Sequence, residues 1–243
     1  MESARGIVLN AVRLNDTHTV VTIYTECAGT VAFVVRRRQD GGGRKTRAAV
    51  WQALSVVSVG WEPVLRRELQ TPTWLVLERP WKTLACDVTK TAMCLYLGEF
   101  LHHALRGEAE NGALFSFLEQ ALTWWDERAD AEPNFHLFLL MHLTSFLGFG
   151  PGVQGYVPGA CFDLCEASFA MATPMHTAFL SPDDARYVPI FWRMSMQMLH
   201  GVRLNGATRR RILTILAEYY RLHLPEFSSP KSLEILAEVM AVR

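Results

Sequence analysis

The stretch GIVLNAVRLNDTHTVVTIYT, residues 6–25, decides how the first third of this chain folds. Residues 6–14 are rich in Ile, Val and Leu, and residues 17–25 alternate around Val, Ile and Tyr side chains, a pattern typical of β-strands. Asn15 and Asp16 lie between them, and both residue types favour tight turns. The pattern predicts an antiparallel hairpin at the start of the chain.

Three more strands are predicted beyond this hairpin. A turn at 26–29 leads to residues 30–35, residues 50–59 resume the β pattern, and residues 73–77 give a fifth run. Five short strands in about eighty residues are the size of an oligonucleotide/oligosaccharide-binding (OB) barrel. This pattern alone leaves an SH3-like barrel open as an alternative.

From residue 86 onward the apolar residues recur with the 3.6-residue period of a helix. Turn residues, Pro and Gly divide this region into separate helices. They are predicted at residues 86–107, 111–125, 133–146, from 181, 208–224 and from 229.

The expected fold class is therefore α+β. A five-stranded OB barrel is predicted at residues 1–81, followed by a helical domain at 82–243. Residues 148–180 are rich in Gly and Pro and are expected to form an irregular segment within the second domain.

Charge is segregated along the chain although the net charge of its 243 residues is zero. Residues 1–81 carry a net charge of +4, residues 82–200 carry −7, and residues 201–243 carry +3. Such segregation indicates that one face, rather than the whole protein, meets a polyanion. Five scattered cysteines, no apparent signal peptide and no apolar run long enough to span a membrane favour a cytoplasmic protein with reduced thiols.

The strongest local signal is a basic segment at residues 36–47, which also contains three consecutive glycines. The segment contains six cationic side chains and one acidic side chain, Asp40. It cannot belong to a packed core, because burying an unpaired guanidinium costs several kcal/mol. We predict that it binds a nucleic-acid backbone, whereas the alternative is a solvated surface loop. The predicted binding residues are Arg36, Arg37, Arg38, Arg44, Lys45 and Arg47.

A second basic cluster, Arg209, Arg210 and Arg211, lies near the start of the helix predicted at 208–224. Three successive helical residues spread over a wide arc, so at least two of them must face solvent. Positive charge near a helix N-terminus is somewhat unfavourable, which favours a binding role for the cluster. The alternative is a charged helix face without a binding role.

Cys161 and Cys165 lie in the segment expected to be irregular, and His176 follows eleven residues later. These residue types can bind zinc, but a structural zinc site needs four ligands and no second cysteine pair is present. We therefore expect no metal, no cofactor and buried apolar cysteines instead. The chain has no HExxH motif and no GxSxG motif, so a non-enzymatic role is expected, and a metal-dependent enzyme using Cys161 and Cys165 remains the alternative from another class.

Several short motifs together resemble the RecO family of bacterial recombination mediators, in order and over essentially the whole chain. Each motif is weakly specific alone, and the match comes from their order and spacing. They are RGIVL at 5–9, the Asp16 turn, YTE at 24–26 with Gly29, the basic segment, LGEFL at 97–101, FSFL at 115–118, NFHL at 134–137, YYRLHL at 219–224 and KSL at 231–233.

This resemblance implies an OB barrel followed by a helical domain, and a role in DNA repair and recombination. RecO-like proteins bind single- and double-stranded DNA and anneal strands coated with single-strand-binding protein. With RecR, and in some pathways RecF, they help RecA load onto single strands. A cytoplasmic protein that associates with the nucleoid during repair is implied.

Two consequences for particular residues follow from the resemblance. The family's basic barrel loop corresponds to the segment at residues 36–47. Some members hold zinc through four cysteines, whereas this segment of the chain has only Cys161 and Cys165, so the site is expected to be lost or degraded. Another kind of OB-fold module that binds RNA or DNA stays an alternative function.

Overall fold

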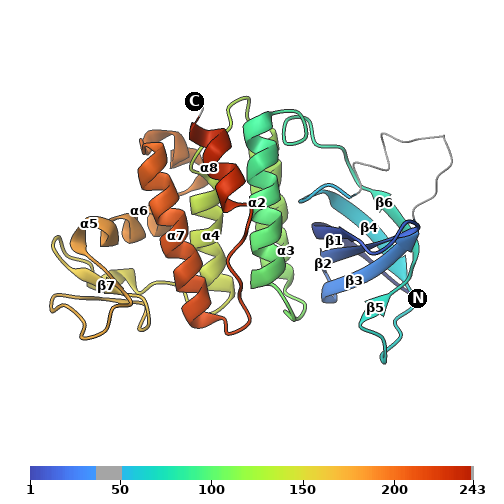
Figure 1. Ribbon diagram of the computed structural model, residues 1–243, viewed down its shortest axis with the longest axis horizontal. Coiled ribbons are helices and arrows are strands. Elements are labelled where there is room, and N and C mark those ends of the chain that lie inside the picture. Colours follow the sequence, from blue (N-terminus) through green and yellow to red (C-terminus); the bar gives the residue numbers. More distant parts are fainter. Residues whose placement is uncertain (37–50, 242–243) are drawn as a thin grey trace. The chain divides into compact units, whose positions relative to one another are not determined.

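The computed structural model describes residues 1–36 and 51–241 (Figure 1). The described chain divides into two compact units. One comprises Met1–Ala129 with Pro230–Val239, and the other comprises Asp130–Ser229. The first unit extends beyond residue 81, where the first domain was predicted to end, because helical residues up to 129 and residues 230–239 belong to the same compact unit as the sheet. The division of the sequence at residue 81 stays a prediction about domain organisation.

One six-stranded sheet forms the β part of the first unit. The predicted hairpin is confirmed as β1 (Glu2–Arg13) and β2 (His18–Thr25). The Asn15 side chain holds its turn by accepting hydrogen bonds from the backbone N–H of Thr17 (2.9 Å) and His18 (2.8 Å). All neighbouring strands are antiparallel except β3 and β5. In sheet order the strands are β5 (Leu69–Gln70), β3 (Gly29–Arg36), β2 (His18–Thr25), β1 (Glu2–Arg13), β4 (Val56–Trp61) and β6 (Pro72–Leu77).

The mixed α+β class is confirmed, but the expected closed five-stranded barrel is corrected to an open sheet. Among the described residues, β5 and β6 form the two edges of the sheet and do not pair with each other. To close the sheet into a barrel, β6 would have to pair with β5, which is only two residues long. Pro72 begins β6 and has no backbone N–H to donate to a neighbouring strand.

Alternation along β4 separates the core of the sheet from its outer face. Val57, Val59 and Trp61 point into the core, where the rings of Phe33 and Trp61 meet edge to face at 5.4 Å. Gly60 points outward, and a Cβ added there would lie 2.3 Å from the Trp74 ring nitrogen. The indole of Trp74 thus lies directly on the sheet backbone.

Three helices complete the first unit: α2 (Val88–Ala104), α3 (Gly112–Asp126) and α8 (Leu233–Ala241). The helix predicted at residues 111–125 is confirmed as α3, and Asn111 is its N-cap, since the Asn111 side chain accepts from the Leu114 N–H at 3.0 Å. Helix α2 packs closely on β1, because a Cβ at Gly98 would lie 2.8 Å from the Leu9 carbonyl oxygen. Glu99 beside it holds the start of the C-terminal segment by accepting from the backbone N–H of Lys231 (3.0 Å) and Ser232 (2.9 Å).

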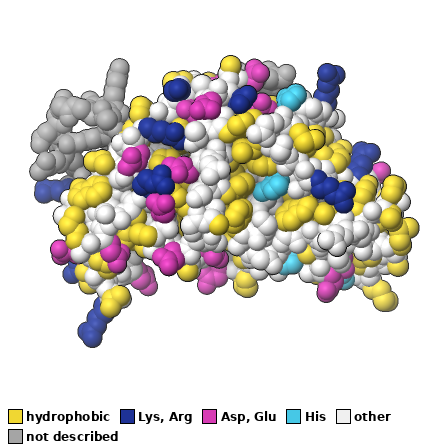
Figure 2. All heavy atoms as spheres, turned by 180° about the vertical axis from the view of Figure 1, so that it is seen from behind, with side chains coloured by type: hydrophobic (Ala, Val, Ile, Leu, Met, Phe, Trp, Pro, Cys, Tyr) yellow, Lys and Arg dark blue, Asp and Glu magenta, His cyan; other side chains and the backbone are white. Residues whose placement is uncertain are grey.

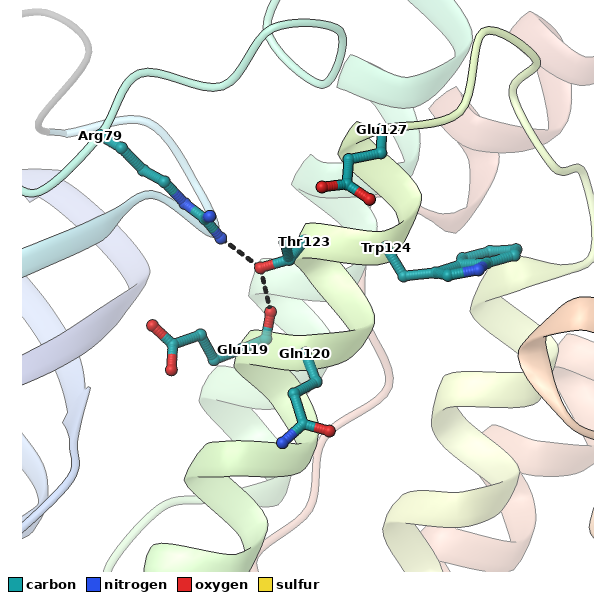
Figure 3. A pocket seen from close by; sticks show the side chains of 6 residues that line it. All are labelled: Arg79, Glu119, Gln120, Thr123, Trp124 and Glu127. Carbon is teal, nitrogen blue, oxygen red and sulfur yellow. Dashed lines mark hydrogen bonds between the residues drawn. The ribbon is translucent and has the colours of Figure 1, made fainter.

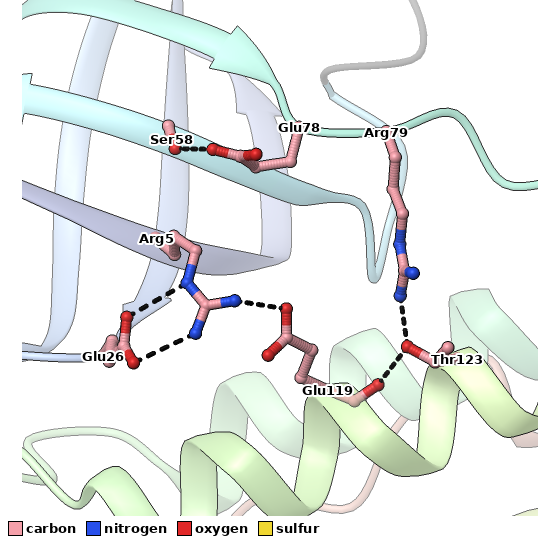
Figure 4. A network of polar contacts seen from close by, with 7 residues as sticks. All are labelled: Arg5, Glu26, Ser58, Glu78, Arg79, Glu119 and Thr123. Atoms are coloured by element: carbon pink, nitrogen blue, oxygen red, sulfur yellow. Dashed lines mark hydrogen bonds and ion pairs between the residues drawn. The ribbon is translucent and has the colours of Figure 1, made fainter.

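Arg5 joins the sheet to α3 (Figure 4). Its guanidinium donates two bonds to the Glu26 carboxylate (3.2 and 3.0 Å) and one to Glu119 (2.7 Å), and it lies 5.4 Å from the Phe115 ring centre. These hydrogen bonds and carboxylate charges outweigh partial burial and raise the pKa of Arg5. The charge of Arg5 is therefore neutralised by two carboxylates within the unit.

The C-terminal end of α3 is capped by the chain segment that leads into α2. The buried Lys90 ammonium donates to the Thr83 hydroxyl (2.7 Å) and to the carbonyls of Trp125 (2.9 Å) and Arg128 (2.6 Å). The Asp126 carboxylate accepts from three backbone N–H groups of the same segment, those of Lys82, Thr83 and Leu84. Burial alone would raise the pKa of Asp126, but these hydrogen bonds lower it overall.

The second unit is built around α4 (Phe135–Phe146), which is buried along most of its length. Helices α6 (Tyr187–Arg193) and α7 (Gly206–His223) pack against it, and the Tyr220 hydroxyl donates to the Leu140 carbonyl at 2.7 Å. The helix start expected at Ser181 is confirmed as α5 (Pro182–Ala185), although this helix is only four residues long. Two 3₁₀ turns complete the unit, η1 (Val153–Gly155) and η2 (Met196–Gly201).

The segment at 148–180, expected to be irregular, contains a small three-stranded sheet. Its strands lie in the order β8 (Ser168–Ala170), β7 (Cys161–Asp163) and β9 (Phe179–Leu180). They are only two or three residues long, so no period of two can be read from the sequence. None of the helices in the described part of the chain combines the length and the apolar character needed to cross a membrane.

Candidate nucleic-acid interface

Arg36 is the one residue of the predicted basic segment that lies within the described residues, and it is exposed. It is the last residue of β3 and pairs with His18, the first residue of β2. Arg13, the last residue of β1, lies at the same end of the sheet because it pairs with Thr19. Arg37, Arg38, Arg44, Lys45 and Arg47 lie outside the described residues.

The chain direction shows where the basic segment leaves the sheet. Strand β3 ends at Arg36 and β4 begins at Val56, so the segment connects two strands of the same sheet. Arg13 forms an ion pair with Asp16 in the hairpin turn, which neutralises its charge locally. Arg36 is therefore the cation at this end of the described sheet that is best placed to continue the charge of the segment.

Sequence reasoning did not single out the basic pair Arg66–Arg67. Both side chains are exposed in the connection between β4 and β5. The Gln70 amide fixes this connection by accepting from the Val64 N–H (2.9 Å) and donating to the carbonyls of Val64 (3.1 Å) and Arg67 (2.6 Å). The sequence could have predicted their exposure, because the two adjacent arginines lie between Pro63 and Pro72 and stretches bounded by proline usually form surface loops.

The arginine cluster at the start of α7 does not present a single charged surface. Arg209 is buried, and its guanidinium donates to the Asn134 side-chain oxygen (3.2 Å) and to the Leu204 carbonyl (3.0 Å). Burial lowers the pKa of Arg209. Arg211 pairs with Asp184 at 2.5 Å, and Arg210 is exposed. We therefore leave Arg209 out of the interface that we propose below.

Replacing Arg209 with leucine is expected to lower the free energy of unfolding by about 1–3 kcal/mol, because the buried Asn134 oxygen and the part-buried Leu204 carbonyl lose their charged donor. Replacing the exposed Arg210 with leucine, the matched control, should change it by less than about 0.5 kcal/mol. Urea unfolding of both variants measures this difference. If Arg209→Leu instead left stability unchanged and flattened the salt dependence of DNA binding, Arg209 would be a DNA ligand.

A shallow pocket of about 300 Å³ lies along α3 in the first unit, where Arg79 of a neighbouring segment reaches the helix (Figure 3). Arg79 donates to the Thr123 hydroxyl there, and the Arg79 guanidinium carbon lies 4.8 Å from the Trp81 ring centre. Glu119 and Glu127 line the same pocket, so its charge does not favour a nucleic-acid backbone. Figure 2 likewise shows cations interspersed with acidic side chains on the face that it draws.

One group of side chains in the described residues could offer several metal ligands. The donor atoms of Asp163, Cys165 and His176 lie within 4.8 Å of one another. Cys161 does not belong to this group: it is buried on β7, whereas Cys165 is exposed. The structure thus brings His176 near Cys165, with Asp163 in place of Cys161. The expectation that both cysteines are buried is correct for Cys161 and wrong for Cys165.

Comparisons with known proteins match nearly the whole chain to a single protein family. The family model described as Recombination protein O N terminal matches residues 1–77, and the model described as Recombination protein O C terminal matches residues 86–234. The DNA repair protein RecO of Phocaeicola vulgatus is 36% identical over 248 residues, covering 99% of this chain and 100% of the relative. The protein of the same name from Bacteroides fragilis is 34% identical (98% of this chain and 99% of the relative), and that of Flavobacterium psychrophilum is 28% identical (98% of each).

Proposed function

The chain belongs to the RecO family of DNA repair proteins, and from this premise we propose that it anneals complementary single strands of DNA. In this proposal the strands are coated with single-strand-binding protein, and the protein also helps RecA load onto single-stranded DNA. RecR is the proposed partner in loading, with RecF in some pathways. Both single- and double-stranded DNA are proposed ligands.

The observation that carries the proposal is the basic segment between β3 and β4. Residues 36–47 carry a net charge of +5. The segment begins at Arg36, which is exposed and is the last residue of β3 in the N-terminal sheet. Neutralising a phosphate with an arginine releases condensed counterions, which drives binding without reading the base sequence. The exposed pair Arg66–Arg67 lies in the same unit but toward the opposite end of β3, because it precedes β5, whose Leu69 pairs with Ala32, so in this proposal only a longer strand contacts both.

Annealing is a reaction that such a surface can support without acid–base chemistry. Two complementary strands repel each other through their phosphates, and bound cations lower this repulsion. Contacts limited to the backbone leave the base edges free to find their complement. The proposed role therefore needs loose, sequence-independent binding, and no residue has to take part in a covalent step.

A strand-annealing assay tests the proposal. Two complementary labelled oligonucleotides are each coated with single-strand-binding protein and mixed with and without the full-length chain. We expect the protein to accelerate duplex formation severalfold, and we expect high salt to abolish the acceleration. If the protein binds the strands but does not accelerate their pairing, it is a nucleic-acid-binding module of another kind.

A further inference from the structure

The carboxylate of Asp163 occupies a central place in the small sheet of the second unit. Asp163 is the last residue of β7, the middle strand, and pairs with Ser168 of β8 and Phe179 of β9. Its side chain is 12% exposed. Both connections of the sheet, β7 to β8 and β8 to β9, pass close to this one side chain.

Each oxygen of the carboxylate holds a different connection. Oδ1 accepts from the backbone N–H of Cys165 (2.8 Å) and Glu166 (3.1 Å) and so shapes the turn that follows β7. Oδ2 lies 3.0 Å from Nε2 of His176, which belongs to the connection between β8 and β9. One side chain thereby links two loops that are separated by a strand.

Apolar packing supports the sheet independently of this link. Phe162 of β7 is buried, and its ring lies 4.9 Å from the Phe169 ring and 6.1 Å from the Tyr219 ring of α7, centre to centre. The Tyr156 ring in turn meets Phe169 at 5.0 Å. These aromatic contacts give the sheet a core of its own, which small metal-bound modules commonly lack.

The donor set fits poorly with a structural metal site. Such a site for zinc is closed by four ligands, usually cysteine or histidine. Among the described residues only Asp163, Cys165 and His176 gather here, and Cys161 is not within their reach. Oδ1 of Asp163 already accepts two backbone hydrogen bonds, and Oδ2 faces His176. A four-cysteine site like that of some relatives cannot form from these residues.

We propose that the hydrogen-bonded pair Asp163–His176 cross-links the loops of the small sheet in this chain, in the place of a metal ion. The pair connects the same two loops that a shared metal would connect, and the aromatic core around Phe162 supplies the remaining stability. Cys165 takes part through its backbone N–H and not through its thiol.

Metal content and three variants test this proposal. The full-length chain, purified without a metal-binding tag, should contain far less than one equivalent of zinc by elemental analysis. Adding zinc or a chelator should leave its thermal unfolding unchanged. In hydrogen–deuterium exchange, Asp163→Ala and His176→Ala should speed exchange across residues 164–178 about tenfold, the factor expected for a lost hydrogen bond of about 1.4 kcal/mol.

Cys165→Ser is the matched control, because it keeps the backbone N–H and removes only the thiol. We expect exchange in this variant to match the unaltered chain. Stoichiometric zinc, together with faster exchange in Cys165→Ser or after chelation, would overturn the proposal and establish a metal site instead. Neither the zinc measurement nor Cys165→Ser depends on whether Asp163→Ala folds.

Discussion

Replacing Arg36, Arg37 and Arg38 together with alanine is expected to weaken binding to single-stranded DNA about a hundredfold at about 0.1 M salt. Each phosphate contact on a single strand contributes about 0.7 to the slope of log affinity against log salt, so three lost contacts lower the slope by about 2. We take the affinities of the two proteins to be equal at about 1 M salt, where the electrostatic contribution is small. A slope difference of about 2 then makes the variant bind about a hundredfold more weakly at about 0.1 M salt. Fluorescence anisotropy of a labelled oligonucleotide at several salt concentrations measures both quantities.

The matched control removes the same charge from the surface elsewhere. Arg106, Arg186 and Lys231 are exposed and lie outside the proposed interface. Their joint replacement with alanine is expected to change the slope much less. If both triple variants weakened binding equally, overall charge rather than the basic segment would account for the affinity.

Replacing the buried Lys90 with methionine is expected to lower the free energy of unfolding by about 3 kcal/mol. Methionine has a similar length but leaves the Thr83 hydroxyl and the carbonyls of Trp125 and Arg128 without the ammonium donor. The favourable interaction of a cation with the C-terminal end of α3 is also lost. Urea unfolding at neutral pH measures the change.

Lys82→Met is the control for this variant, since Lys82 lies in the same segment but is exposed. A change below about 0.5 kcal/mol is expected there. Equal stability of Lys90→Met and the unaltered chain would mean that the cost of burying the ammonium cancels its three hydrogen bonds, which is the outcome that contradicts the expectation.

The elements that local patterns determine were predictable from the sequence. Apolar runs around Asn15 predicted the β1–β2 hairpin, and the helices predicted at 111–125 and 208–224 agree with α3 and α7 to within two residues at each end. The strand pattern could not show whether the sheet closes, because closure depends on backbone pairing between the edge strands β5 and β6, and nearness in the sequence does not determine whether two strands pair. It also missed β7, β8 and β9, which are too short to carry a period.

The position of Arg209 could have been found by a closer reading of helix periodicity. Ile212, Leu213 and Leu216 lie three, four and seven residues after it, and all of them are buried. Those spacings place Arg209 on the apolar face of α7, whereas Arg210 lies about 100° further round the helix axis, outside that face. Its contact with Asn134 could not be predicted, because Asn134 lies far away in the sequence.

Helix periodicity did not predict that Lys90 and Asp126 are buried. Each is a charged residue at a helix end, and helix ends are usually exposed. Their burial depends on the packing of the segment at 82–90 around the C-terminus of α3, which brings residues more than thirty positions apart into contact. Long-range backbone acceptors of this kind cannot be read from a single sequence.

A hydrogen–deuterium exchange footprint of DNA on the full-length chain tests most directly whether the basic segment binds DNA. Exchange is compared with and without a saturating oligothymidylate, at low salt. We predict that residues 36–50 gain the strongest protection and that the peptide containing Arg66 and Arg67 gains some. Unchanged exchange in residues 36–50, with protection confined to residues 82–243, would contradict the account.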